Sequence, residues 1–277
     1  MAIGGADAAS FLQGLITIDI ERITPALSAW GALLTPQGRW LHDFFVIKDP
    51  DNEGFLLDCE HARSDDLKQR LLRYRLRANV DIALCPDRYA VAVAFGESLS
   101  YDTFQLTPQE GHTHHKDGSI FYVDPRAAVG GVRILVDATR ALDALALSTD
   151  PEPYTQWRIR HVLPQGTPDF IPERSLLLDN NADTLHGIDW HKGCYIGQEV
   201  TARMYHRGKK KRTLCCVPMV APATPPPYPC PMKHNNETIG EIRLVSGGYG
   251  LANVTLPFNT KLTWHFDDSL QAFVAQP

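Results

Sequence analysis

The sequence predicts an α+β fold. Strand-like and helical segments follow one another along 277 residues without the regular strand–helix–strand repeat of a doubly wound sheet. A chain of this length forms about one large domain or two to three small ones. The composition changes after Cys216, because seven prolines fall between Pro218 and Pro231 and strand-like segments follow them. A mixed core followed by a smaller β domain is therefore expected.

The core is predicted to begin with a short helix and a hairpin. Asp7 can cap a helix around Phe11. Residues 35–38 read Thr-Pro-Gln-Gly, which is typical of a turn, so residues 30–34 and 40–47 are expected to pair. Further strands are expected at residues 54–59, 80–84, 89–95, 119–123 and 132–136, and helices at residues 62–77, 138–147 and 154–162. The helix at 62–77 is amphipathic, with leucines on one side and five basic residues from Lys68 to Arg77.

The last third of the chain is predicted to be irregular and then β-rich. Residues 164–192 form a long segment without a clear period, and such segments in compact domains are usually functional or disordered. A short helix is expected at residues 197–205. Beyond the proline-rich segment, strands at residues 238–245, 251–256 and 261–266 predict a small barrel-like domain.

Composition and charge exclude several classes of protein. The net charge of −5 and the pI near 6.1 exclude a generally basic nucleic-acid coat. No apolar run reaches the roughly 18 residues of a membrane span, so no membrane partner is expected. The N-terminus lacks the pattern of a signal peptide. Six cysteines without a CxxC pair indicate free thiols, and a cytoplasmic location is expected.

The segment around Cys194 is the most informative one. Gly193 and Gly197 flank the cysteine and allow close approach of the backbone to a ligand. A cation at Lys192 and a helix beginning just downstream would both favour the thiolate. Cys194 could therefore be a nucleophile, a soft metal ligand or a redox thiol, and the alternative is a small buried residue in a tight turn.

A basic run follows the helix expected at residues 197–205. Six of the ten residues from 203 to 212 are basic, namely Arg203, Arg207, Lys209, Lys210, Lys211 and Arg212. This local positive patch could hold phosphates or a polyanionic partner, with Tyr205 stacking on a base. The alternative is a solvated charged loop.

Other candidate motifs carry less information. His112, His114 and His115 lie in a polar loop with few carboxylates, so no metal site is predicted. Trp157 is either a core residue or a platform for a ligand. The chain contains no dinucleotide-binding, phosphate-loop, zinc-protease or serine-hydrolase motif, and these functions have no support.

Residues 192–199 match the KGCYxGQE signature of the YgfZ family through Lys192, Gly193, Cys194, Tyr195, Gly197, Gln198 and Glu199. This family comprises folate-binding proteins related to T-protein, the aminomethyltransferase of the glycine cleavage system. The resemblance covers nearly the whole chain. It includes residues 11–14, 33–39, 172–173, 187–190, 206–208, 239–241 and 250–252, together with Thr17, Asp43 and Asp179.

The resemblance implies a T-protein-like architecture of three lobes around a central hole. Two interleaved α+β lobes would occupy residues 1–212, and a β-barrel would occupy residues 213–277. It also implies non-covalent tetrahydrofolate in the hole, with Trp157 against the folate and polar contacts from Asp43, Glu173 and Lys192. Cys194 would be the functional thiol, and iron–sulfur enzymes or assembly factors, including tRNA-modifying enzymes, would be the partners.

Two departures from the family pattern are expected to weaken folate binding. The strand that usually precedes the opening helix is expected to be missing. The segment from Arg158 to Gln165 lacks the acidic residue that is common after the tryptophan-bearing helix.

The favoured hypothesis is an accessory protein for maturation or repair of iron–sulfur enzymes. Since a cluster normally has four protein ligands, Cys194 alone supports only a transient or shared ligand. One alternative is an aminomethyltransferase in which Asp43 orients or deprotonates an amine. Another is a module that uses the basic run to bind tRNA or an acidic protein surface.

Overall fold

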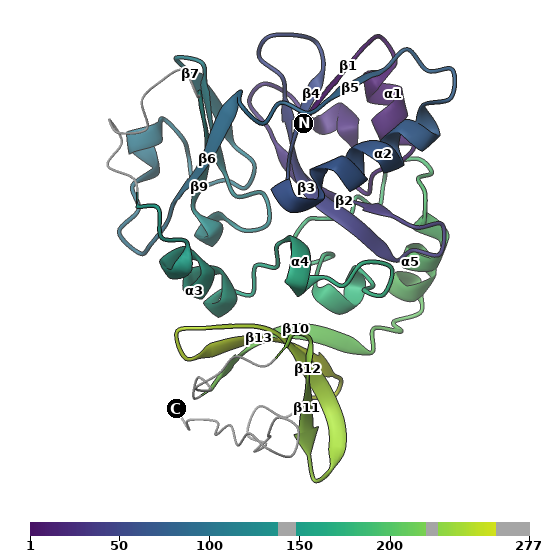
Figure 1. The fold of residues 1–277 in the computed structure, drawn as a ribbon, viewed down its shortest axis with the longest axis vertical. Helices are drawn as coiled ribbons and strands as arrows, with labels where there is room; N and C mark the ends of the chain where they lie inside the picture. The colour runs from purple at the N-terminus through teal and green to yellow at the C-terminus, as the bar shows by residue number, and fades with distance from the viewer. Residues whose placement is uncertain (138–147, 220–226, 259–277) are drawn as a thin grey trace.

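The computed structural model describes residues 1–137, 148–219 and 227–258, which form three sheets of antiparallel strand pairs. Two sheets lie side by side in the upper part of Figure 1, and the third lies below them. The mixture of helices and antiparallel strands confirms the α+β class. The helix expected at residues 138–147 and the strand expected at 261–266 lie outside the described residues.

The first sheet contains five strands in the order β2-β3-β4-β1-β5. They are β1 (Ala2–Gly4), β2 (Ala29–Leu34), β3 (Trp40–Lys48), β4 (Phe55–Cys59) and β5 (Asp81–Ala83). The predicted hairpin is confirmed, because β2 pairs with β3 and Ala32 lies opposite Asp43. The expectation of a missing first strand is wrong. The three residues of β1 pair with β4 on one side and with β5 on the other.

Helices α1 (Ala8–Gln13) and α2 (Ser64–Arg75) pack against this sheet through a shared apolar cluster. Leu67 and Leu71 are one helical turn apart and both are buried. Asp65 and Asp66 lie in the first turn of α2, where negative charge suits the helix dipole. The predicted amphipathic helix is thus confirmed.

The second sheet has the order β6-β9-β8-β7. Its strands are β6 (Tyr89–Ala94), β7 (Thr113–Lys116), β8 (Ser119–Val123) and β9 (Val132–Asp137). The polar loop expected around three histidines is partly wrong, because β7 contains His114 and His115 and pairs with β8. A polar sequence can form such a strand when tertiary pairing outweighs its weak propensity. Among the described residues, no group of three or more candidate ligands could hold a metal ion.

The segment after residue 160 returns to the first sheet and covers its other face. Phe170 is fully buried there between Trp30 and Trp40, with ring centroids 6.4 and 5.1 Å away. Tyr122 of the second sheet and Tyr195 belong to the same apolar cluster. The described residues also contain the helices α3 (Glu152–Arg160), α4 (Gly166–Asp169) and α5 (Gln198–His206). Short 3-10 turns among them are Ile20–Arg22, His61–Arg63, Tyr101–Phe104, Ala128–Gly130 and Leu178–Asn180.

The third sheet is formed by residues 212–255 in the order β10-β13-β12-β11. Its strands are β10 (Arg212–Pro218), β11 (Cys230–His234), β12 (Glu237–Ser246) and β13 (Tyr249–Thr255). The described part is an open sheet, so the expected closed barrel stays a prediction. Of the helices in the described part of the chain, none is long and apolar enough to cross a membrane.

Gly197 fixes the start of α5 close to the β2–β3 turn. Its φ is +84°, and a Cβ placed there would lie 2.6 Å from the Thr35 carbonyl oxygen. A Cβ on Gly193, four residues earlier, would meet no atom within 4 Å. The two glycines of the signature therefore differ in what the fold requires of them.

We expect Gly197→Ala to lower the free energy of unfolding by about 3 kcal/mol, since alanine there is strained and collides with backbone. Gly193→Ala is the matched control and should change it by less than about 0.5 kcal/mol. Urea unfolding of both variants measures the difference. Equal losses would contradict the assignment of the constraint to Gly197.

Candidate functional site

Lys192 holds the signature loop, residues 192–197 ahead of α5, to the N-terminal part of the chain. Its ammonium group donates hydrogen bonds of 2.7 Å to the carbonyl oxygens of Ile16 and Ile18. Burial lowers the pKa of Lys192 to about 8, although Asp19 and Asp189 favour the charged form. The side chain points into the protein, and its hydrogen bonds hold the loop in place.

A second set of hydrogen bonds joins the same two segments. The Thr17 hydroxyl donates to the Gly187 carbonyl oxygen at 2.6 Å and accepts from the Ala32 amide at 2.9 Å. The Asp189 amide donates to the Thr17 carbonyl oxygen, also at 2.9 Å. The entry to the signature loop is thereby fixed to the first sheet.

Cys194 is exposed at the surface of this fixed loop. The next residue, Tyr195, is buried in the core beneath the loop. Gln198 and Glu199 begin α5, and Glu199 forms an ion pair with Arg203. The alternative of a small buried residue in a tight turn is wrong for Cys194, because its side chain is exposed and the nearby turn spans residues 195–198, just after it. The loop therefore presents the thiol to solvent or to a partner.

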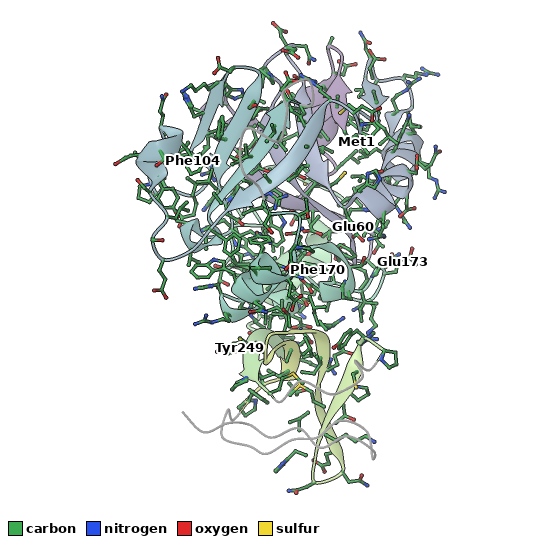
Figure 2. The ribbon with its side chains drawn as sticks, turned by 60° about the vertical axis from the view of Figure 1, so that its left-hand side comes forward. Met1, Glu60, Phe104, Phe170, Glu173 and Tyr249 are labelled. Atoms are coloured by element: carbon green, nitrogen blue, oxygen red, sulfur yellow. The ribbon has the colours of Figure 1, made fainter. Side chains whose placement is uncertain are left out.

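A cavity of about 340 Å³, here called the Asp43 cavity, lies where the two upper sheets meet α4. Its walls include Asp43, Phe45, Asp58, Glu60, Arg133, and residues 165–167. Among these, the Gln165 Oε1 atom is buried without a hydrogen-bond partner in the described structure. Glu60 accepts a hydrogen bond from the Thr167 amide at 3.0 Å, and Figure 2 shows Glu60 above Phe170. The cavity thus combines an apolar wall with several acceptors.

Asp43 is the most perturbed carboxylate of this cavity. Burial raises its pKa to about 6, against the opposing effects of two hydrogen bonds and of Arg126. The Trp30 indole N–H donates to it at 3.0 Å, and the Gly166 amide donates at 3.1 Å. The carboxylate therefore changes its charge close to physiological pH.

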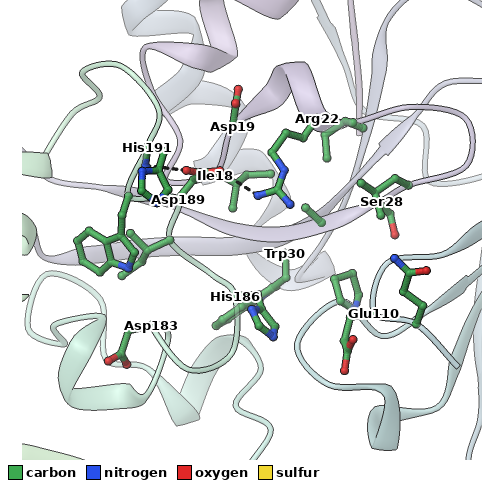
Figure 3. Close-up of a pocket in the computed structure, with 17 residues that line it drawn as sticks. Ile18, Asp19, Arg22, Ser28, Trp30, Glu110, Asp183, His186, Asp189 and His191 are labelled. Carbon is green, nitrogen blue, oxygen red and sulfur yellow. Dashed lines mark hydrogen bonds and ion pairs between the residues drawn. The ribbon is translucent and has the colours of Figure 1, made fainter.

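A second cavity, the signature-side cavity, has a volume of about 360 Å³ and is shown in Figure 3. Asp189 lies between Arg22, at 3.1 Å, and the His191 amide, at 2.8 Å. Trp190 and the Trp30 ring also line this cavity. The Trp30 N–H bonds to Asp43, so this side chain connects the signature-side cavity to a residue that lines the Asp43 cavity.

Trp157 and Glu173, two of the residues predicted to contact folate, lie outside the two cavities. Trp157 is in α3, half-buried, and its indole N–H donates to the Val129 carbonyl oxygen at 2.7 Å. Glu173 has a side chain that is 64% exposed and lies 3.4 Å from Arg70. Figure 2 shows Glu173 near the outer edge of the molecule. Neither residue is among the described residues that line the Asp43 cavity or the signature-side cavity.

The basic run is only partly free. Lys210 donates to the Asn181 side chain at 3.0 Å, and Arg212 lies 3.3 Å from Glu241 of β12. The backbone amide groups of Lys211 and Arg212 both donate to Asp179. Arg207 and Lys209 are exposed. The end of the run therefore joins the core to the third sheet instead of forming a solvated loop.

Sequence reasoning missed the roles of Trp30, Glu60 and Thr17 in these cavities and contacts. Trp30 could have been found from the hairpin. With Ala32 opposite Asp43, Trp30 lies diagonally across from Asp43 on the same face of the sheet. Glu60 and Thr17 depend on contacts between distant segments, for which the sequence has no local signal.

Comparison with solved structures identifies the fold class. The crystal structure of glycine cleavage system aminomethyltransferase T from Bartonella henselae superposes with a TM-score of 0.70. The match covers 99% of this chain and 82% of that chain, at 15% sequence identity. The chain therefore has the T-protein fold. No family model matches the sequence.

Comparison with curated proteins identifies the family. The human iron–sulfur cluster assembly factor IBA57, mitochondrial, is 30% identical over 267 residues, which cover 91% of this chain and 74% of the human protein. The mouse protein is 31% identical over 268 residues. The IBA57 homologue of Pyricularia oryzae is 34% identical over 223 residues, but the match covers only 54% of it. The chain belongs to the IBA57 family and spans about half the length of several fungal members.

These relatives correct one expectation and narrow another. The prediction of a cytoplasmic protein is wrong, because the matched relatives are named as mitochondrial proteins. The relatives carry the name IBA57 rather than YgfZ, so the narrower YgfZ assignment stays a prediction.

Adjacent residues in β3 give a test of the electrostatics. Burial lowers the pKa of His42 to about 4, despite its 2.9 Å hydrogen bond to Asp66, so its imidazole is neutral. As pH falls from 6.5 to 4, the unfolded chain binds a proton at His42 first, which costs stability. Over nearly the same range the folded chain binds a proton at Asp43 first, which adds stability.

We therefore expect the two contributions to cancel in part, and single substitutions to reveal them. Between pH 6.5 and 4.5, Asp43→Asn should make the loss of stability on acidification steeper. His42→Gln should convert the loss of stability on acidification into a gain. Each substitution should alter the change in the free energy of unfolding over this pH range by at most about 3 kcal/mol. Urea unfolding at several pH values gives the slope. Parallel pH profiles for the wild type and both variants would contradict the two assignments.

Proposed function

We propose that this protein is an accessory factor in the maturation of iron–sulfur proteins. The observation that carries the proposal is the exposed Cys194 thiol on a loop that Lys192 holds in place, in a chain of the IBA57 family. The human relative is named an iron–sulfur cluster assembly factor. Partners would therefore be iron–sulfur enzymes or other assembly factors.

Cys194 supplies one thiolate ligand to a cluster that is cargo. The thiol loses its proton to solvent when the sulfur–iron bond forms, and a partner supplies the remaining ligands, since clusters normally need four. An exposed thiol can share a cluster in this way, whereas a buried one cannot be reached. The fixed loop reduces the ordering cost of forming the shared complex.

The exposed part of the basic run would help to orient the partner. Arg207 and Lys209 follow α5, which begins four residues after Cys194. An acidic protein surface beside the cluster ligands would complement them. The internal contacts of Lys210 and Arg212 leave less of this run for tRNA than the sequence predicted.

We also propose that the Asp43 cavity binds tetrahydrofolate non-covalently. Its volume of about 340 Å³ falls at the lower end for small-molecule sites. The pyrimidine edge of a pterin presents N–H donors. Asp43, Glu60 and the unpartnered Gln165 Oε1 are acceptors that fit such an edge.

When bound, tetrahydrofolate would carry a one-carbon unit. Asp43, with a pKa of about 6, would hold or release a proton beside the ligand. In a chain with the T-protein fold, a ligand-binding core would occupy residues 1–212 and a separate, barrel-like unit would occupy residues 213–277. The three lobes around a central hole belong to the same proposal.

The thiol is tested by Cys194→Ser. We expect the purified variant to keep its thermal midpoint, because the side chain is exposed. It should fail to restore the activity of cluster-dependent enzymes, including a tRNA-modifying one, in cells that lack the protein. Cys85→Ser, another free cysteine, is the control and should restore activity. Full restoration by Cys194→Ser would overturn the proposed role.

The folate site is tested by equilibrium binding of tetrahydrofolate under anaerobic conditions. Asp43→Ala should weaken binding by about 10- to 100-fold, because it removes a charged acceptor. Asp102→Ala changes an exposed carboxylate outside the cavity and is the control. Glu173→Ala and Trp157→Phe test the positions that the resemblance favours. Loss of binding in these two variants but not in Asp43→Ala would contradict the Asp43 cavity as the site.

A further inference from the structure

Helix α2 ends in a strongly basic segment that the proposed function does not use. Between Leu67 and Val80 there are five basic residues and no acidic one, in a chain of net charge −5. These residues are Lys68, Arg70, Arg73, Arg75 and Arg77. In the described structure, ion pairs are formed by Arg70, with Asp66 and Glu173, and not by the other four. The positive charge is therefore largely unneutralised.

Two apolar side chains project from the same place, here called the α2 tip (residues 73–77). Leu76 is 87% exposed, and Tyr74 is 37% exposed. Leu76 also has a φ of +43°, a region that disfavours residues with a Cβ. The fold thus carries a backbone cost at the position where it exposes a leucine.

The α2 tip is held by its surroundings. Leu67 and Leu71 are buried beneath the helix. After the tip, the Asn79 amide donates to the Asp7 carboxylate at 2.8 Å, and the Asp7 amide donates to the Asn79 carbonyl oxygen at 3.1 Å. The α2 tip is therefore fixed in place, and Figure 1 shows α2 packed along the first sheet, away from the second sheet.

Stability of the helix explains only part of this arrangement. Arg73 and Arg75 in the last turn suit the negative end of the helix dipole. The dipole does not account for Arg77 beyond the helix, nor for the exposure of Leu76. A leucine exposed among arginines instead suits a partner that offers apolar material behind a layer of negative charge.

We propose that the α2 tip binds the surface of a bilayer that contains anionic lipids. Leu76 and Tyr74 enter the interfacial region, and the arginines bond to lipid phosphates. A bilayer needs no pocket that is complementary to the α2 tip, whereas a protein partner does. Two apolar side chains alone bind weakly, so the charges and Leu76 are both needed. The sequence-based expectation of no membrane partner rested on the lack of a spanning segment, which surface binding does not require.

The test is co-sedimentation of the full chain with vesicles of phosphatidylcholine, with and without about one third phosphatidylglycerol. We expect binding to the anionic vesicles and little to phosphatidylcholine alone. Arg73→Glu with Arg77→Glu should lower the partition coefficient by about 25-fold or more, taking roughly fivefold per arginine. Leu76→Ser should lower it by about fivefold at physiological salt, since it removes the apolar contact.

The matched control is Arg207→Glu with Lys209→Glu, which makes the same charge change in the other basic run. It should bind anionic vesicles within about twofold of the wild type. Equal loss in both charge-reversal pairs would show general attraction and overturn the α2 tip as the site. Absence of binding to anionic vesicles at low salt would also overturn it. So would binding of polyglutamate, but not of vesicles, with the same sensitivity to Leu76→Ser, because this result indicates an acidic protein partner.

Discussion

The ammonium group of Lys192 is buried and bonds to the carbonyl oxygens of Ile16 and Ile18, which lie 176 and 174 residues earlier in the chain. Such a group is costly to bury unless its hydrogen bonds are satisfied, so its position determines where both segments lie. Thr17, between the two carbonyls, bonds to residues of the loop and of β2. The first sheet, the entry to the signature loop and the exposed thiol are therefore fixed together.

The β2–β3 hairpin also connects distant parts of the molecule, through its residues Trp30 and Asp43. The Trp30 indole borders the signature-side cavity and donates to the carboxylate that lines the Asp43 cavity. A Cβ added to Gly187 would lie 2.6 Å from the Trp30 ring, so the chain before the signature packs directly on it. The Trp30–Asp43 hydrogen bond therefore connects the two cavities, and a shift of the Trp30 ring would disturb a lining residue of each.

Local patterns predicted most elements but few of the contacts between them. The hairpin around residues 35–38 and helix α2 were predictable, because turn chemistry and leucine spacing act within a few residues. Strand β7 was not, since a polar histidine segment pairs there with an apolar neighbour. The resemblance alone predicts that Lys192 and Glu173 contact a ligand. In the structure the Lys192 side chain points to the carbonyl oxygens of residues 16 and 18, and the Glu173 side chain points to Arg70. No local pattern in the sequence encodes these long-range contacts.

The separation between Lys192 and its two carbonyl partners has a consequence for synthesis of the protein. Ribosomes add about 5–20 residues per second, so roughly 10–35 s separate the appearance of the first partner from that of Lys192. Until then the N-terminal strands lack the cation that holds residues 16–18, and the thiol-bearing loop does not yet exist. A nascent chain therefore passes through a period with an incomplete core. During this period more apolar surface is open to chaperone binding than in the finished protein.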